Sequence, residues 1–257
     1  MRSSRILQKL KNGEYVTIVQ NWIIPHWKMV DLIGLVGFDA VWIENEHSDF
    51  TSAQISQMIL AARSRNMDAL VRVTRCGYTE IIKPLEAGAS GVVVPHCTSG
   101  TDAAAIVRDA KFAPLGMRGA GGGVDSDYGN HDYLEYAQHA NAQTMVAVLI
   151  EDKQAVDNID AIAATAGVDL LLLGPYDLSQ SYGVFGQIES TPVLKAIDAL
   201  ADACARHGKH WGLPISDRAH AQKMLKRGAR VLQLKNDQQV LQSGFRAMKQ
   251  TFADISY

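Results

Sequence analysis

Short apolar runs recur along the whole chain. They are rich in valine, isoleucine and leucine and too short to be apolar helices, so each predicts a strand, buried on both faces where the run is uninterrupted. The clearest is the run of four leucines at 170–173, which a Gly-Pro corner ends. The eight candidate strands are residues 15–20, 39–44, 69–73, 91–95, 145–151, 169–174, 210–215 and 230–235.

Helical patterns separate most of these runs. The clearest are residues 51–66, 101–111, 154–167, 191–208 and 217–229. Strands that alternate with helices form parallel sheets, because a parallel pair needs a crossover connection. Eight such units in one chain predict a (β/α)8 TIM barrel of class α/β, a single domain over residues 1–257. An open doubly wound sheet is the alternative, but its G-x-G-x-x-G fingerprint is missing after the first strand.

Residues 114–143 break the alternation. They combine the glycine-rich stretch GAGGG, at 119–123, with a helical pattern before the fifth candidate strand. Insertions of this kind lie at a functional rim or a subunit contact more often than in a core. The stretch could cradle a phosphate, but no Lys-Ser/Thr pair follows it as in a P-loop. A lid or an interface loop is therefore the favoured interpretation.

Composition and charge exclude several classes of partner. The 257 residues are 47% hydrophobic and 20% charged, with a net charge of −2. This balance lacks the basic excess that nucleic acids or anionic membranes require. No apolar run approaches the roughly 18 residues of a membrane span, and no signal peptide is evident, so we expect a soluble, cytoplasmic protein. The three cysteines, Cys76, Cys97 and Cys204, lack C-x-x-C spacing, which predicts reduced thiols.

Ionisable residues gather where the candidate strands end. The carboxyl ends of the strands form the catalytic face of a (β/α)8 barrel, so these residues are the candidates for chemistry. They are Glu44, Glu46 and His47 after the second strand, Arg72 in the third, His96 after the fourth, Glu151 at the end of the fifth and Asp177 after the sixth.

Glu151 and Asp177 follow consecutive strands, so their carboxylates are expected to converge. Two close carboxylates repel each other unless one is protonated or a cation lies between them. Oxygen ligands with room for water favour Mg²⁺ or Mn²⁺. The alternative is that each acid caps the helix that follows it, and the spacing does not decide between the two.

Arg72 lies in an apolar strand and should have an anionic partner. That partner could be a substrate carboxylate or enolate, or a buried acid such as Glu86. His47, three residues after Glu44, could be a general base that Glu44 tunes. The alternative for His47 is a hydrogen-bonded loop residue.

A set of motifs resembles the HpcH/HpaI family of class II, metal-dependent pyruvate aldolases. The motifs are WIENEH (42–47), LVRV (70–73), LEAGASGVVVPH (85–96), PLGMRG (114–119), VLIE (148–151) and GPYDLSQSYGVFGQ (174–187). The resemblance runs from about residue 5 to 250. It implies a barrel of the phosphoenolpyruvate/pyruvate type and a hexamer, a trimer of dimers with an exchanged C-terminal helix. It also implies a lyase that cleaves a 4-hydroxy-2-oxo acid reversibly to pyruvate and an aldehyde.

The resemblance also implies roles for individual residues. The metal ligands fall on Glu151 and Asp177, for Mg²⁺ or Mn²⁺, with Co²⁺ or Ni²⁺ possible. The arginine that stabilises the enolate falls on Arg72, and the catalytic histidine on His47. The turn at Gly174 and Tyr176 would offer backbone N–H groups to the pyruvate carboxylate.

Some positions depart from the family pattern. Glu44, beside the histidine, and Glu86, near a subunit contact, replace residues that are commonly Asp. Leu149 replaces a frequent glutamine, and Pro214 an aliphatic residue. These changes raise an alternative function, an enolate-forming relative such as an oxaloacetate decarboxylase or a C–C-joining enzyme. A third hypothesis is a binding or assembly protein that keeps the fold and the metal.

Overall fold

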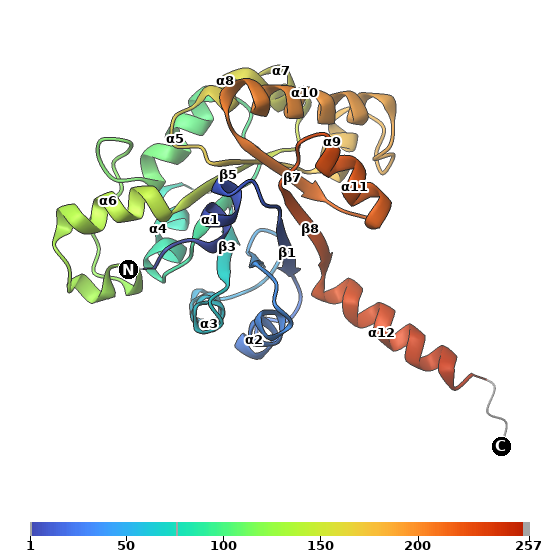
Figure 1. Ribbon diagram of the computed structural model, residues 1–257, viewed down its shortest axis with the longest axis horizontal. Helices are drawn as coiled ribbons and strands as arrows, with labels where there is room; N and C mark the ends of the chain where they lie inside the picture. Colours follow the sequence, from blue (N-terminus) through green and yellow to red (C-terminus); the bar gives the residue numbers. More distant parts are fainter. Residues whose placement is uncertain (1, 76, 254–257) are drawn as a thin grey trace.

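A closed barrel of eight parallel strands forms the centre of the molecule (Figure 1). A computed structural model describes residues 2–75 and 77–253. The strands pair in chain order, and the last closes on the first. They are β1 (Val16–Asn21), β2 (Ala40–Glu44), β3 (Asp68–Arg72), β4 (Gly91–Val94), β5 (Met145–Ile150), β6 (Leu170–Leu173), β7 (His210–Pro214) and β8 (Val231–Asn236). Each begins within one residue of its predicted start, so the predicted barrel is confirmed.

Helices surround the barrel and return the chain from one strand to the next. They are α1 (Arg5–Lys11), α2 (Trp27–Val36), α3 (Ser52–Ser64), α4 (Tyr78–Glu86), α5 (Gly100–Ala110), α6 (Tyr133–Gln143), α7 (Lys153–Asp157), α8 (Ile159–Ala164), α9 (Pro175–Ser181), α10 (Thr191–His207), α11 (Arg218–Lys226) and α12 (Asp237–Thr251), with a 3₁₀ turn, η1 (Val124–Gly129).

One predicted helix is divided. The pattern at 154–167 forms α7 and α8, which meet at Asn158. The backbone of Asn158 is not helical, and its side-chain amide donates a hydrogen bond to the carbonyl of Thr98, 2.9 Å away. Asparagine favours such local polar bonds over a helix interior. The apolar period continued across this break, so the sequence pattern did not reveal it.

The barrel interior is apolar along most of its length. Side chains alternate along each strand, so every second residue points inward. Inward residues include Ile18, Trp42, Leu70, Val93, Leu149 and Leu172. Helix α1 adds Ile6 and Leu10 to this cluster and closes the amino-terminal mouth of the barrel. The middle of the barrel is thereby apolar, with polar side chains at its carboxyl end and, at the amino-terminal mouth, Asp68, which accepts hydrogen bonds from Ser4 Oγ and the Ile6 N–H.

Helix α12 extends away from the barrel (Figure 1). It follows β8 directly, and almost all of its residues are exposed. The exposed apolar residues of this segment are Val240, Phe245, Met248 and Phe252, which together we call the α12 stripe. Their spacing places them along one side of a helix, an arrangement that usually marks a packing surface.

Two further sequence predictions concern cysteines and membranes. Cys97 and Cys204 are free and buried, and burial raises the pKa of each thiol to about 12. Cys76 lies outside the described residues. Within residues 2–75 and 77–253, none of the helices combines the length and the apolarity that a membrane span requires.

Candidate active site

A layer of polar side chains lies above the apolar interior at the carboxyl end of the barrel. Gln20, Glu44, Arg72, Glu151 and Gln233 each stand two residues after an inward apolar residue of the same strand segment. The period of two therefore turns all five into the barrel. The first four are buried, and Gln233 is partly buried. Chain topology thus collects charges from separate strands in a small volume.

Glu44 is the hydrogen-bonding centre of this layer. It is fully buried, and Arg72 Nε lies 3.0 Å from its Oε1 and 2.8 Å from its Oε2. Gln20 donates to Oε2 at 2.8 Å, and Gln233 donates in turn to Gln20 at 2.9 Å. Oε1 also accepts from the backbone N–H groups of the next turn. Such donors are what makes a buried carboxylate tolerable.

The acidic partners of Arg72 are not the buried acid Glu86 that the sequence suggested as one alternative. Its Nη1 lies 3.1 Å from Glu46 Oε2, so Arg72 pairs with Glu44 and Glu46 rather than with Glu86. Among the residues that the structure describes, none accepts a hydrogen bond from Nη2. Arg72 is thus held at one edge, and the other is available to an anionic ligand.

The surroundings of His47 correct another expectation. Glu44 contacts the backbone N–H of His47, at 3.0 Å, and not its ring. The carboxylate near the ring belongs to Glu46, whose Oε2 lies 3.6 Å from Nε2. The ring is 53% exposed and stacks on Trp22, with centroids 6.2 Å apart. Any carboxylate that tunes this imidazole directly is Glu46, because the buried Glu44 is turned toward Arg72.

Glu151 is a buried carboxylate at the end of β5. Its side chain is 2% exposed, and its Oε1 accepts the backbone N–H of His96 at 2.9 Å. His96 presents that N–H from a left-handed backbone, with φ 52°, an uncommon conformation that often marks functional sites. Burial raises the pKa of Glu151 to about 7, and the negative charge of Asp177 acts in the same direction.

The Gly-Pro corner after β6 makes room for Glu151. A Cβ at Gly174 would lie 2.7 Å from Glu151 Oε2, so only glycine fits without displacement. Its backbone φ of −96° is open to any residue, so the constraint is steric.

The availability of the Gly174 N–H differs from the expectation. This N–H already donates to Ile150 at 3.1 Å, so it is not available to a substrate carboxylate. Tyr176 and Asp177 lie in the first turn of α9, where N–H groups lack intrahelical partners.

Glu151 and Asp177 fit a divalent cation. Both supply oxygen, and the negative charge of Asp177 contributes to the raised pKa of Glu151, a repulsion that a cation between the two would relieve. Among residues 2–75 and 77–253, no cluster of three or more histidine, cysteine or acidic side chains forms a closed metal site. A two-carboxylate site leaves coordination positions for water and substrate, as catalytic magnesium sites do.

Glu86 lies away from this layer in the same chain. It ends α4, which runs back from the carboxyl end of β3 to the start of β4. There it packs under the glycine-rich stretch, where a Cβ on Gly121 would lie 2.2 Å from Glu86 Oε1. Its expected role at a subunit contact stays a prediction.

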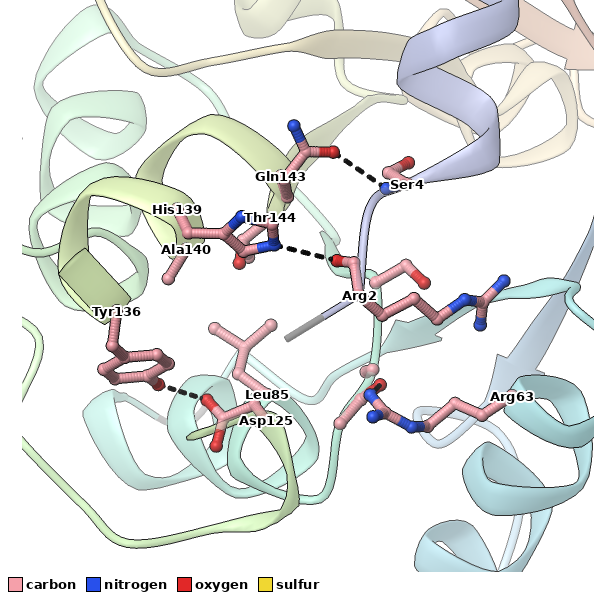
Figure 2. A pocket seen from close by; sticks show the side chains of 13 residues that line it. Arg2, Ser4, Arg63, Leu85, Asp125, Tyr136, His139, Ala140, Gln143 and Thr144 are labelled. Carbon is pink, nitrogen blue, oxygen red and sulfur yellow. Dashed lines mark hydrogen bonds between the residues drawn. The ribbon is translucent and has the colours of Figure 1, made fainter. Parts of the chain in front are cut away.

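A separate cavity of about 40 Å³ lies at the amino-terminal end of the barrel (Figure 2). Arg2, Arg63 and His139 line it, and the Tyr136 hydroxyl points to Asp125. This volume holds a few water molecules. The polar layer, on the opposite face of the barrel, is therefore the candidate active site.

Sequence reasoning missed Gln20, Gln233 and the pairing of Glu46 with Arg72. A signal for the glutamines was present, since each interrupts an apolar strand at an inward position. The direction of the Glu46 side chain carried no such signal. It depends on the turn that Glu44 organises.

Comparisons with known proteins agree with the barrel and identify the family. The sequence pattern of the HpcH/HpaI aldolase/citrate lyase family matches residues 25–243. A hydroxypyruvate/pyruvate aldolase of Roseobacter denitrificans is 34% identical over 237 residues, which cover 90% of each chain. A 4-hydroxy-4-methyl-2-oxoglutarate aldolase of Chaetomium globosum is 33% identical over 220 residues, which cover 82% of this chain and 79% of the relative.

A solved structure extends the likeness to three dimensions. The crystal structure of an HpcH/HpaI aldolase from Desulfitobacterium hafniense DCB-2 superposes with a TM-score of 0.93 at 28% identity. The superposition covers 98% of this chain and 97% of the other.

Gly174→Ala should weaken cation binding, because the added methyl group displaces the Glu151 carboxylate. We expect a loss of about 10- to 100-fold in Mn²⁺ affinity, the range seen for changes beside metal ligands. Isothermal titration calorimetry measures it. Gly244→Ala is the control, since a Cβ there meets nothing within 4 Å. Unchanged Mn²⁺ affinity in folded Gly174→Ala would contradict the arrangement.

The metal-free protein should lose stability as the pH rises, through Glu151. The pKa of Glu151 is about 7 in the folded protein, which is above its value in the unfolded chain. The contribution of Glu151 to the free energy of unfolding is therefore fully present below about pH 4 and is lost as the pH rises through about 7. In EDTA, the unfolding free energy of the wild type should fall by about 2.5 kcal/mol more than that of Glu151→Gln between about pH 5 and pH 8. Urea titrations at each pH measure the difference. If the unfolding free energies of the wild type and Glu151→Gln change in parallel with pH, the pKa of Glu151 is not raised.

Proposed function

The chain belongs to the HpcH/HpaI aldolase/citrate lyase family, and we propose that it is a divalent-metal-dependent aldolase acting on a 4-hydroxy-2-oxo acid. Family and relatives make it a carbon–carbon lyase. The proposed products are pyruvate and an aldehyde, and the reaction is reversible. The observation that carries the proposal is the buried layer in which Arg72 is clamped by Glu44 beside the carboxylate of Glu151.

Glu151 and Asp177 are the proposed ligands of the cation, with Mg²⁺ or Mn²⁺ favoured and Co²⁺ or Ni²⁺ as alternatives. When bound, the cation would supply Lewis-acid chemistry and withdraw electrons from the 2-oxo group of the substrate. Gly174 leaves the space for Glu151, and the His96 N–H orients the Glu151 carboxylate. These contacts support a pre-arranged ligand set.

Arg72 is the proposed stabiliser of the enolate. Breaking the C3–C4 bond moves an electron pair toward C3 and leaves negative charge on the oxygen at C2. The guanidinium of Arg72 is fixed by Glu44 and Glu46, and its Nη2 can donate a hydrogen bond to the oxygen at C2. A donor that is already oriented stabilises a developing charge without reorganisation.

His47 is the proposed base. It would remove the proton from the C4 hydroxyl, so that C4 becomes the aldehyde carbonyl as the C3–C4 bond breaks. The enolate then takes a proton at C3 and becomes pyruvate. The exposed ring of His47, beside Glu46, can exchange its proton with solvent between turnovers.

One observation favours a second candidate, an enolate-forming relative such as an oxaloacetate decarboxylase or a C–C-joining enzyme. Glu44 is committed to Arg72, so His47 lacks the direct carboxylate partner that the motif suggested. Decarboxylation of oxaloacetate releases CO₂ and forms the same enolate without a base at a C4 hydroxyl. It therefore needs Arg72 and the carboxylates but not His47.

We also propose that the chain assembles into a homo-oligomer, a hexamer built as a trimer of dimers, through exchange of α12. The α12 stripe is too apolar to remain in water without cost. Leu32, Leu35 and Val36 on α2 form a second exposed apolar surface that a neighbouring α12 could cover. Exchange of an identical element is a common route to such assemblies.

Asp177→Ala should abolish aldol cleavage. Removing one of two ligands costs several kcal/mol of transition-state stabilisation, which corresponds to a loss of about a thousandfold or more in kcat/KM. Release of pyruvate from 4-hydroxy-2-oxo acids measures it. Asp157→Asn is the control, since that exposed carboxylate pairs with Lys153. Full activity of folded Asp177→Ala would reject the proposal.

The two candidate functions predict different behaviour of His47→Ala. An aldolase should lose cleavage by about 100-fold or more and keep any decarboxylation of oxaloacetate, because general-base catalysis contributes factors of this size. A decarboxylase should release CO₂ from oxaloacetate efficiently both as the wild type and as His47→Ala. It should yield little pyruvate from any 4-hydroxy-2-oxo acid. Parallel assays of the two substrates decide.

Charge on the α12 stripe should dissociate the assembly. Phe245→Glu with Met248→Glu places two desolvated charges in the proposed contact and should lower the sedimenting mass. Gln242→Glu is the control, because it adds charge to an exposed polar position of the same helix. Analytical ultracentrifugation compares the three proteins. A wild-type monomer, or an oligomer unchanged by the double substitution, would contradict helix exchange.

A further inference from the structure

Another buried carboxylate, Asp237, lies beside the candidate active site at the first residue of α12. It is 3% exposed and pairs with none of the Lys, Arg or His side chains among the described residues. Apart from the N–H of the neighbouring Gln238, its hydrogen-bond donors come from the end of β1 and the segment that follows it, residues 21–24. Since a buried carboxylate is costly, a cluster of donors this complete needs a structural or functional reason.

Asp237 holds the segment after β1 by its backbone. Oδ1 accepts the N–H of Trp22 at 2.9 Å, and Oδ2 accepts those of Ile23 and Ile24 at 3.1 and 3.0 Å. Oδ2 also accepts the Asn21 side-chain amide at 3.0 Å. Consecutive N–H groups that converge on one anion form a rigid backbone nest. The position of Trp22 is therefore set from α12, more than 200 residues away in sequence.

Trp22 carries this constraint to His47. The two rings stack with centroids 6.2 Å apart and planes 17° apart, within the range of offset aromatic stacking. His47 has an exposed ring and, apart from Glu46 at 3.6 Å, no other recorded side-chain partner among the described residues. The indole thus stacks on this imidazole at the exposed rim of the site.

We propose that Asp237 is a positioning residue for His47. It anchors the segment that carries Trp22, and Trp22 orients the imidazole. The catalytic part of this inference rests on the proposed function, whereas the structural part does not. Because Asp237 begins α12, the seat of that helix on the barrel also sets the orientation of the proposed base.

The structural part is tested by ¹⁹F NMR of protein labelled with 5-fluorotryptophan. The chain has four tryptophans, and Trp22→Phe assigns the Trp22 resonance. In the wild type, His47→Ala should shift this resonance, because the neighbouring ring is lost. In Asp237→Asn, His47→Ala should shift it much less, because the stack is already released. Asp160→Asn, at an exposed carboxylate paired with Arg206, should behave as the wild type.

The catalytic part is tested by kinetics on the same proteins. Asp237→Asn should lower kcat for aldol cleavage by about tenfold or more and leave KM nearly unchanged, since a displaced catalytic group slows chemistry more than binding. Trp22→Phe keeps a stacking ring and should retain most of kcat, whereas Trp22→Leu should lose it as Asp237→Asn does.

Two results would overturn the proposal. One is a His47→Ala shift of the Trp22 resonance that is as large in Asp237→Asn as in the wild type. The other is an Asp237→Asn protein in which the stack of Trp22 on His47 is released but kcat for aldol cleavage is unchanged. If Asp237→Asn fails to fold, the same measurements on Asp237→Ser decide. If the wild type shows no aldolase activity, the proposed function fails and the NMR comparison still decides whether Asp237 holds the stack.

Discussion

The ion pair between Glu44 and Arg72 is the interaction on which the candidate site depends. Both groups are buried in the barrel, where an unpaired charge would cost several kcal/mol. The same carboxylate fixes the turn that carries Glu46 and His47 and takes the amide of Gln20. Removing it would therefore release the guanidinium and the turn together. One buried acid links the proposed enolate stabiliser to the proposed base.

The barrel makes this arrangement possible. Parallel strands end on one face, and the inward period of two lifts polar residues from five strands into a single layer. Leu149 and the other apolar layers below exclude water from beneath the layer, so hydrogen bonds within it are strong. The Gly174 corner then leaves room for the Glu151 carboxylate. Strand register and a few turns thus bring these residues together at one face.

Much of this was open to prediction from sequence. The eight strands begin within one residue of their apolar runs, because a short apolar run bounded by polar residues or turns is typical of a strand buried on both faces. The residues that gather at the site were also predictable, since topology places them at strand ends. Their pairing was not. Whether Glu44 turns to Arg72 or to His47 depends on side-chain rotamers, and the nest around Asp237 joins segments distant in sequence.

In the proposed reaction, the two carboxylates and Arg72 together stabilise a pyruvate enolate. NMR of deuterium incorporation into the methyl group of pyruvate in D₂O tests it most directly, with Mg²⁺, with EDTA and with Arg72→Lys. We expect exchange that requires Mg²⁺ and is largely lost in Arg72→Lys, because a lysine ammonium cannot bond Glu44 and Glu46 as Nε and Nη1 of Arg72 do and also present a fixed donor to the enolate. Exchange that persists in EDTA or in folded Arg72→Lys, or no exchange in protein shown to bind Mg²⁺, would contradict it.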